Sequence, residues 1–116
     1  METDAAFIRQ IYAAFNARDL DTLLAAMHPE VVWPNGMEGG YMQGRDAVRD
    51  YWTRQWAQID PQVEPQHVAR LPGGTLHVTV HQVVRDLAGA VLIDQRIAHV
   101  YTVESGFVRR MEIQQP

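Results

Sequence analysis

The polar side chains that could perform chemistry are concentrated along strand-like stretches in the last forty residues of the chain. Side chains on a strand point to alternate faces of a sheet, so odd and even positions separate into two sets. The odd set contains His77, His81, His99 and Tyr101, and the even set contains Gln82, Asp94 and Arg96. These residue types serve in acid–base catalysis and in contacts with anions. We expect one set to line an interior and the other to lie on an outer surface.

The amino-acid composition excludes several kinds of chemistry. The chain of 116 residues has no cysteine, which excludes disulfides, thiolate nucleophiles and thiolate metal sites. All ten basic residues are arginine, which excludes a lysine Schiff base and a Walker-type phosphate loop. The only serine, Ser105, stands beside Gly106 in a turn signal, a poor setting for a nucleophile. We predict no metal and no organic cofactor.

Length and charge indicate the class of protein. The chain is long enough for one core, and we expect a single domain over residues 1–116. A formal charge of −4 disfavours nucleic acid as a partner. The acidic start of the chain is unlike a signal peptide, and no apolar run approaches membrane-spanning length. We therefore expect a cytoplasmic protein with neither a nucleic-acid nor a membrane partner.

Hydrophobic periodicity predicts an α+β fold in which helices come first. The predicted helices cover residues 3–15, 20–27 and 45–58. Thr3 or Asp4 is available to cap the first helix, Asp19 to cap the second, and Pro29 to end it.

Strand patterns dominate the second half. The predicted strands cover residues 31–33, 63–71, 75–84, 90–103 and 107–114, with a loop or small hairpin over 37–44. Three turn clusters connect the last four strands as antiparallel neighbours. Pro65 interrupts the first of these four, which indicates an edge strand or a bulge. Three helices on one face of a curved, mostly antiparallel sheet follow from this order.

Four segments together resemble the nuclear transport factor 2-like superfamily, which includes ketosteroid isomerases, polyketide cyclases and limonene epoxide hydrolase. The segments are Phe15–Asp21, His28–Trp33, Gly44–Val48 and Gly106–Glu112. The resemblance covers nearly the whole chain. It implies a cone-shaped, barrel-like α+β fold, also called cystatin-like, with a largely apolar pocket. It also implies a homodimer through the outer sheet face.

The resemblance locates the catalytic positions of ketosteroid isomerase-like members, and all three are altered. Pro34 stands where the general base would be, and Ala98 where a second carboxyl would donate to an enolate oxygen. Ile11 aligns best with the assisting tyrosine, which leaves Tyr12 one residue out of phase. Steroid isomerisation by that mechanism is therefore not expected.

Limonene epoxide hydrolase-like members carry an Arg-x-Asp pattern on the same strand, and here only the arginine, Arg96, is retained. The alignment implies that the even positions of this strand point into the pocket. Arg96 would then hold an anionic or carbonyl oxygen, with Asp94 orienting it, so these two are the candidate catalytic residues. An ion pair between them at the pocket mouth is an equally valid interpretation.

The candidate pocket residues combine aromatic walls with a few polar groups. They are Tyr12, Phe15, Trp33, Asn35, Trp52, Trp56, Gln82, Ala98, Met111 and Ile113. The tryptophans could equally be plain core residues, and Asn35 a plain turn residue.

The odd positions of the meander allow two interpretations. If the numbers of paired residues add up to about 176, His77 faces His99 across the hairpin, and the two could form a metal site or an acid–base pair. The favoured alternative is an outer face buried in a dimer. The candidate interface residues are His77, His81, Ile97, His99 and Tyr101. A hairpin register that differs by one would change the face of a strand.

Two functional hypotheses remain open. The first is a small-molecule pocket protein, with possible isomerase, cyclase, lyase or hydrolase activity on an apolar oxygenated compound. The second is a non-catalytic ligand-binding or dimerisation module, which the missing carboxylates favour. The sequence does not name a substrate or a reaction.

Overall fold

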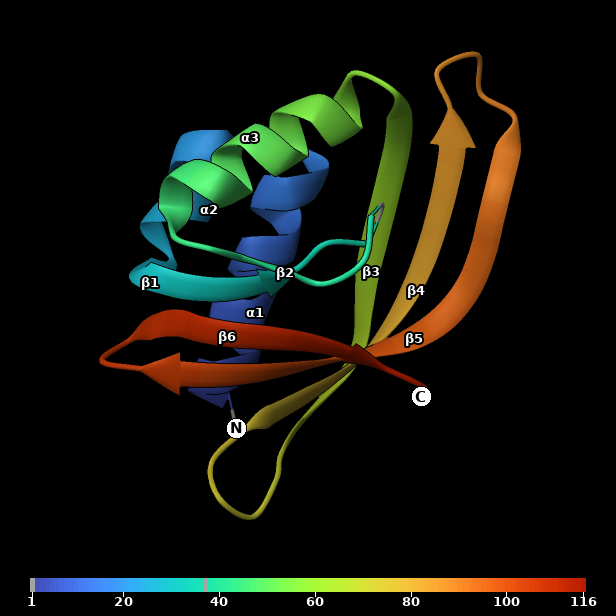
Figure 1. Cartoon of the computed structure of the whole chain (residues 1–116). Coiled ribbons are helices and arrows are strands. Elements are labelled where there is room, and N and C mark those ends of the chain that lie inside the picture. The colour runs from blue at the N-terminus through green and yellow to red at the C-terminus, as the bar shows by residue number, and fades with distance from the viewer. Residues whose placement is uncertain (1, 37) are drawn as a thin grey trace.

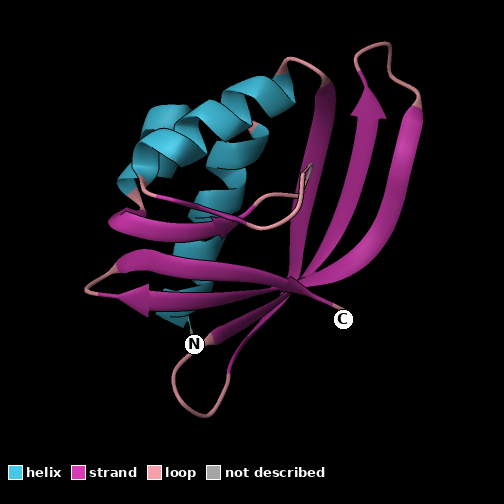
Figure 2. Cartoon of the chain, viewed as in Figure 1, coloured by secondary structure: helices cyan, strands magenta, loops and turns pink. Residues whose placement is uncertain are grey.

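Three helices pack against one face of a six-stranded sheet in the computed structural model, which describes residues 2–36 and 38–116 (Figures 1 and 2). The helices are α1 (Glu2–Asn16), α2 (Leu20–Ala25) and α3 (Arg45–Trp56). The strands are β1 (Met27–Pro34), β2 (Tyr41–Gln43), β3 (Ile59–Arg70), β4 (Leu76–Asp86), β5 (Val91–Glu104) and β6 (Phe107–Gln114). The predicted α+β class is confirmed.

The three helices lie close to their predicted positions. The helix α1 begins at Glu2, so neither Thr3 nor Asp4 precedes it as a cap; Asp4 pairs instead with Arg70 at 2.9 Å. The predicted cap of α2 is confirmed, because the Asp19 carboxylate accepts a hydrogen bond from the Thr22 amide. This helix ends earlier than predicted, at Ala25, and β1 starts two residues later and runs through Pro29.

The sheet has the strand order β2-β1-β6-β5-β4-β3, in which β1 and β6 are parallel and all other neighbours are antiparallel. The small hairpin predicted over 37–44 corresponds to β2, which pairs with β1; Met37 lies outside the described residues. Both alternatives raised for Pro65 are present, since β3 is an edge strand and its register shifts between Pro65 and His67.

One extra residue in β5 determines which side chains of this strand face the helices. Near the turn, Arg85 lies opposite Val91, but the next pair is Val84 with Ile93, so Leu92 is an additional residue. From there on His99 lies opposite Val78, and His77 lies opposite Val100. Because side chains alternate, one added residue moves every later side chain of β5 to the other face relative to β4. The register that would place His77 against His99 is therefore wrong.

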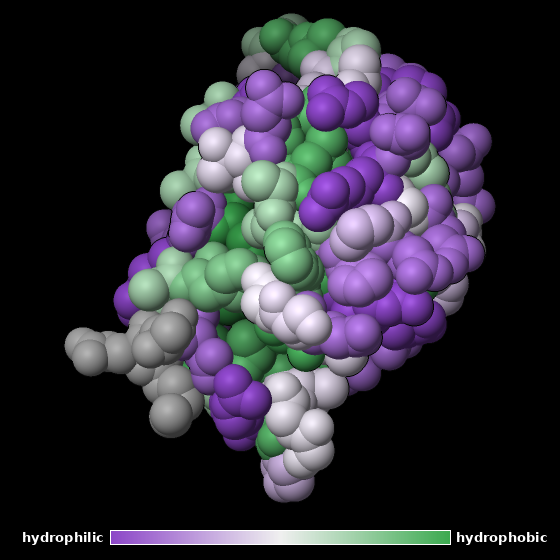
Figure 3. All heavy atoms as spheres, turned by 90° about the vertical axis from the view of Figure 1, so that its left-hand side faces the viewer, coloured by the Kyte–Doolittle hydropathy of each residue, from purple (hydrophilic) through white to green (hydrophobic). Residues whose placement is uncertain are grey.

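The core lies between the helices and the inner face of the sheet. Its strand contribution comes from even positions of β4, such as Val78 and Val80, and from odd positions of β5, Ile97 and Tyr101. On the face shown in Figure 3, hydrophobic residues form a band between more hydrophilic flanks, so apolar side chains reach the surface on this side.

The sheet is strongly curved, and β5 takes part in two regions of it. Its first half stands beside β4, away from the helices, and its second half turns beneath them beside β6 (Figure 1). Burial follows this division, because residues 91–96 are exposed and residues 97–99 are buried. Only the second half of β5 is therefore in a position to line an enclosed site.

Candidate functional site

The helices and the inner sheet face enclose a cavity of about 110 Å³. Most of its lining is aromatic or aliphatic, and the lining residues come from all three helices and from five of the strands, β1, β3, β4, β5 and β6. The lining residues are Ile11, Tyr12, Phe15, Leu23, Trp33, Pro34, Gly36, Tyr51, Trp52, Gln55, Val63, Gln82, His99, Tyr101, Met111 and Ile113. Among these described lining residues there is no aspartate, glutamate or arginine, so the cavity has no fixed charge.

A chain of three hydrogen-bonding side chains forms the polar part of the cavity wall. The Tyr101 hydroxyl donates to the Tyr12 oxygen over 2.9 Å, and the Tyr12 oxygen lies 2.6 Å from Nδ1 of His99. With its oxygen occupied by Tyr101, the Tyr12 hydroxyl can donate to Nδ1, which assigns the imidazole proton to Nε2. All three side chains border the cavity, although they come from α1 and β5.

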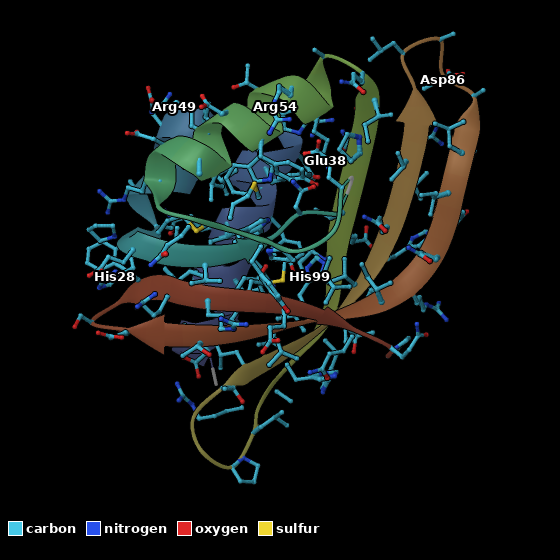
Figure 4. The ribbon with its side chains drawn as sticks, viewed as in Figure 1. His28, Glu38, Arg49, Arg54, Asp86 and His99 are labelled. Atoms are coloured by element: carbon cyan, nitrogen blue, oxygen red, sulfur yellow. The ribbon has the colours of Figure 1, made fainter. Side chains whose placement is uncertain are left out.

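The second ring nitrogen of His99, Nε2, is not hydrogen-bonded to the described part of the protein, and His99 lines the cavity. Among the described residues no hydrogen bond reaches Nε2, and the only buried side-chain nitrogen or oxygen without a partner is Nε1 of Trp56. The Nε2 atom must therefore have accessible surface, although His99 is only 8% exposed. Figure 4 labels His99, which lies in the space between the helices and the sheet. A ligand in the cavity can reach this nitrogen.

Burial controls the protonation of these groups. It lowers the pKa of His99 from 6.5 to about 4, so the imidazole is neutral at pH 7. Burial also raises the pKa of Tyr12, and the neighbouring Tyr101 raises it further. The pKa of Tyr101 is raised by burial as well, partly offset by its hydrogen bond to Tyr12. The cavity is thus uncharged at neutral pH.

The aromatic wall is held together by ring contacts. Trp52 is 1% exposed and contacts Trp33 edge-on, with ring centroids 5.1 Å apart. It also stacks on Trp56 at 6.2 Å, and Phe15 packs edge-on against both rings of this pair. The guanidinium of Arg18 lies over the Trp56 ring, 5.0 Å from its centroid, in a cation–π contact.

Polar groups also stand near the exposed side of the cavity. The Tyr51 hydroxyl accepts hydrogen bonds from the Gly36 amide and from Gln55. Gln82 accepts one from Gln95, its cross-strand neighbour. Ile113 lines the cavity and is 46% exposed, which places it at the opening.

Seven of the ten predicted pocket residues line the cavity in the structure. They are Tyr12, Phe15, Trp33, Trp52, Gln82, Met111 and Ile113. Trp56 stands behind Trp52, and Asn35 binds Glu38 within its own loop. Ala98 is fully buried but neighbours Thr79 and Gln114 on the opposite side of β5 from His99, so it does not face the cavity.

The two candidate catalytic residues lie outside the cavity, and their predicted orientation is wrong. Arg96 is opposite His81, and Asp94 forms an exposed ion pair with His81 at 2.7 Å instead of orienting Arg96. The extra residue Leu92 is the physical cause, since it directs the even positions of β5 outward.

The same shift corrects the predicted dimer interface. His77 and His81 lie on the outer face, as expected. Ile97, His99 and Tyr101 point inward: Ile97 and Tyr101 belong to the core, and His99 and Tyr101 border the cavity. A metal site that joins His77 to His99 is excluded because these residues lie on opposite faces. The described residues also contain no group of three or more potential metal ligands.

The residue types of His99 and Tyr101 indicate chemical capability, but the predicted face of both residues is wrong. The alignment with the family contains a signal for the correct face. Ala98 and Ile11 align with functional positions of the family, and each is one residue from a member of the Tyr12–His99 pair. A displacement of both alignments by one residue would align the two functional positions with Tyr12 and His99.

A six-stranded curved sheet with three helices on its inner face defines a cystatin-like α+β fold with an internal pocket. The chain belongs to the SnoaL-like domain family, whose pattern matches residues 8–111, and thereby to the nuclear transport factor 2-like superfamily. No helix among the described residues is long and apolar enough to cross a membrane.

Solved structures share this fold over nearly the whole chain. A nuclear transport factor 2-like protein of unknown function from Burkholderia pseudomallei is 26% identical, with a TM-score of 0.84 over 100% of this chain and 92% of that one. TerC, crystallised with polyporic acid, is 24% identical, with a TM-score of 0.81 over 97% and 90%.

A third solved structure shares the fold. A Sinorhizobium meliloti protein provisionally assigned as a polyketide cyclase is 21% identical, with a TM-score of 0.79 over 94% of each chain. A search of curated proteins finds no match to this sequence.

Proposed function

We propose that the cavity binds a small, neutral and largely apolar molecule through one polar contact with Nε2 of His99. The observation that carries the proposal is the open Nε2 of His99, held in place through Nδ1 by Tyr12 at 2.6 Å inside an otherwise apolar wall. TerC, which has the same fold, was crystallised with a small molecule, polyporic acid, and this supports a ligand-binding use of the fold.

The absence of charge among the described lining residues distinguishes the expected ligand. A carboxylate would lose its hydration shell and find neither an arginine nor a protonated histidine there. A ketone, phenol or lactone loses much less hydration free energy and can accept a hydrogen bond from Nε2. We therefore expect a neutral ligand, and not the anionic ligand that Arg96 in the pocket would favour.

The test is saturable binding of 1-indanone, a neutral bicyclic ketone, followed by the fluorescence of Trp33 and Trp52 and by native mass spectrometry. The variant Ile113→Trp should close the opening and abolish binding, because Ile113 lines the cavity and is half exposed. The matched control Leu92→Trp adds the same ring at a residue 56% exposed on the distal hairpin, and should leave binding intact. Binding that is unaffected by Ile113→Trp would overturn the proposal.

A catalytic role of the same pocket is the second candidate, and His99 would be its acid–base group. The low pKa of His99 makes it a weak base, which favours binding over catalysis. Deuterium exchange at C2 of 1-indanone in heavy water separates the two roles. Exchange that the protein accelerates and that His99→Gln abolishes would establish catalysis, and exchange at the rate without protein would establish binding alone.

We also propose a homodimer through the outer sheet face. The helices cover only the inner face (Figure 1), and this leaves the face that carries His77 and His81 free for a second copy. Native mass spectrometry at micromolar concentration should show the dimer. His81→Asp should weaken it, because it places a second carboxylate beside that of Asp94 on this face. A wild-type monomer would contradict this proposal.

A further inference from the structure

We propose that Tyr101, Tyr12 and His99 form a reversible hydrogen-bond relay, which lets Nε2 of His99 act either as a donor or as an acceptor toward the ligand. The inference rests on the proposed function, because it concerns the same cavity. It adds the ligand class: molecules whose polar group exists in an acceptor and a donor form, as in a ketone and its enol.

The first arrangement of the relay is the one described above. Tyr101 donates to Tyr12, Tyr12 donates to Nδ1, and the proton on Nε2 points to the cavity. In this arrangement the site offers a donor at His99, which suits a carbonyl oxygen. The Tyr101 oxygen, also at the cavity wall, retains a lone pair.

The second arrangement uses the same atoms with every hydrogen bond reversed. Nδ1 of His99 donates to the Tyr12 oxygen, and the Tyr12 hydroxyl donates to Tyr101. The Tyr101 hydroxyl then points to the cavity, and Nε2 presents a lone pair that suits an N–H or O–H group. Both hydrogen-bond distances serve either direction, because each tyrosine hydroxyl is donor and acceptor.

The change between the arrangements balances in protons. The Tyr12 proton moves to Nδ1, the Tyr101 proton moves to Tyr12, and Nε2 releases its proton to water or ligand in the cavity. Tyr101 takes up one proton from the cavity in return. Each group gives one proton and receives one, so no charge remains in a cavity whose described lining could not compensate it.

The position of the relay supports a role in ligand recognition. Both ends, His99 and Tyr101, border the cavity, so a ligand there can meet either end of the relay. Tyr12 joins the two ends and is 3% exposed, which makes it the residue that couples them. We assign Tyr12 as a positioning residue that acts through His99.

Three bicyclic probes of similar size separate the possibilities. 1-Indanone only accepts a hydrogen bond, indole only donates one through its N–H, and indane does neither. Wild-type protein should bind 1-indanone and indole each about fivefold more tightly than indane, the value of one net hydrogen bond in a buried site. The readout is tryptophan fluorescence, with native mass spectrometry as a check on stoichiometry.

Tyr12→Phe should remove the preference for indole and leave the preference for 1-indanone. Without the Tyr12 hydroxyl, a proton on Nδ1 would be buried without an acceptor, so His99 stays in the form with the proton on Nε2. Tyr101→Phe should produce the same selective loss to a smaller extent, because only the reversed arrangement needs its oxygen as an acceptor. Tyr41→Phe, which removes a hydroxyl from a residue 54% exposed, is the matched control and should change neither preference.

Nitrogen-15 NMR of wild-type protein tests the relay with all three of its side chains in place. The variant His99→Gln is used only to assign the His99 signals, by their loss. The free and 1-indanone-bound protein should show the proton on Nε2, and indole should move it to Nδ1. A proton that stays on Nε2 with indole bound would overturn the relay, although 1-indanone binding would preserve the proposed function. A failure of all three probes to bind would overturn the proposed function itself.

Discussion

Two histidines on neighbouring strands make equally short hydrogen bonds in opposite surroundings. His99 lies 2.6 Å from the Tyr12 hydroxyl inside the cavity wall, and His81 lies 2.7 Å from the Asp94 carboxylate on the outer face. His99 is 8% exposed, whereas the side chains of His81 and Asp94 are 37% and 61% exposed. By sequence the outer pair, a histidine with a carboxylate, is the more familiar catalytic combination.

Because the Tyr12–His99 contact is enclosed, its loss should lower the stability more than loss of the exposed His81–Asp94 pair. Water screens the His81–Asp94 pair, and an exposed pair of this kind contributes at most about 1 kcal/mol. The Tyr12–His99 contact is shielded from water, so loss of either partner leaves a polar atom without a substitute.

The largest difference is expected for truncation of a side chain on each face of β5. Tyr101→Ala removes a ring that is 1% exposed and should lower the free energy of unfolding by about 3–5 kcal/mol. Thr102→Ala, at the next residue on the exposed side, should change it by less than about 0.5 kcal/mol. Urea denaturation measures both. Similar losses for the two variants would show that the faces are not distinct.

The pH dependence of stability should distinguish His99 from His81. The pKa of His99 is lowered from 6.5 to about 4 in the folded state, so between these values the unfolded chain binds the additional proton. Stability should therefore fall as the pH decreases from 6.5 to about 4, by about 3 kcal/mol in total.

Denaturation at a series of pH values measures this dependence, and glutamine variants assign it. His99→Gln should remove most of the decrease between pH 6.5 and 4, because glutamine does not titrate. His81→Gln should leave this part of the profile in place. A profile that is equally steep in wild type and His99→Gln would refute the assignment to His99.

A smaller difference is expected when one partner of each short hydrogen bond loses its polar atom. Tyr12→Phe should cost about 1–3 kcal/mol, because Nδ1 of His99 remains buried without a partner. Asp94→Ala should cost less than about 1 kcal/mol, since water replaces the lost contact. Thermal unfolding followed by circular dichroism compares the two, and equal costs would contradict the role of enclosure.

The sequence predicts the fold far better than the orientation of its central strand. Helical stripes, the Asp19 cap and the three hairpin turns depend on local chemistry, and each corresponds to an element of the structure. The face of β5 depends on one added residue near an exposed turn, Leu92, which no local preference distinguishes from its neighbours. Without Leu92, the side of β5 that carries Arg96 and Asp94 would face the helices. With Leu92, the side that carries His99 and Tyr101 faces them.

The smallest expected effect tests this reversal directly. Arg96→Ala and Asp94→Ala should each leave the affinity for 1-indanone within about twofold of wild type, because both residues lie on the outer side of β5. His99→Phe keeps the apolar volume but removes the donor, and it should reduce the affinity to that for indane. If Arg96→Ala weakened binding as much as His99→Phe, the even positions of β5 would face the ligand, and the register that assigns His99 to the cavity would be wrong.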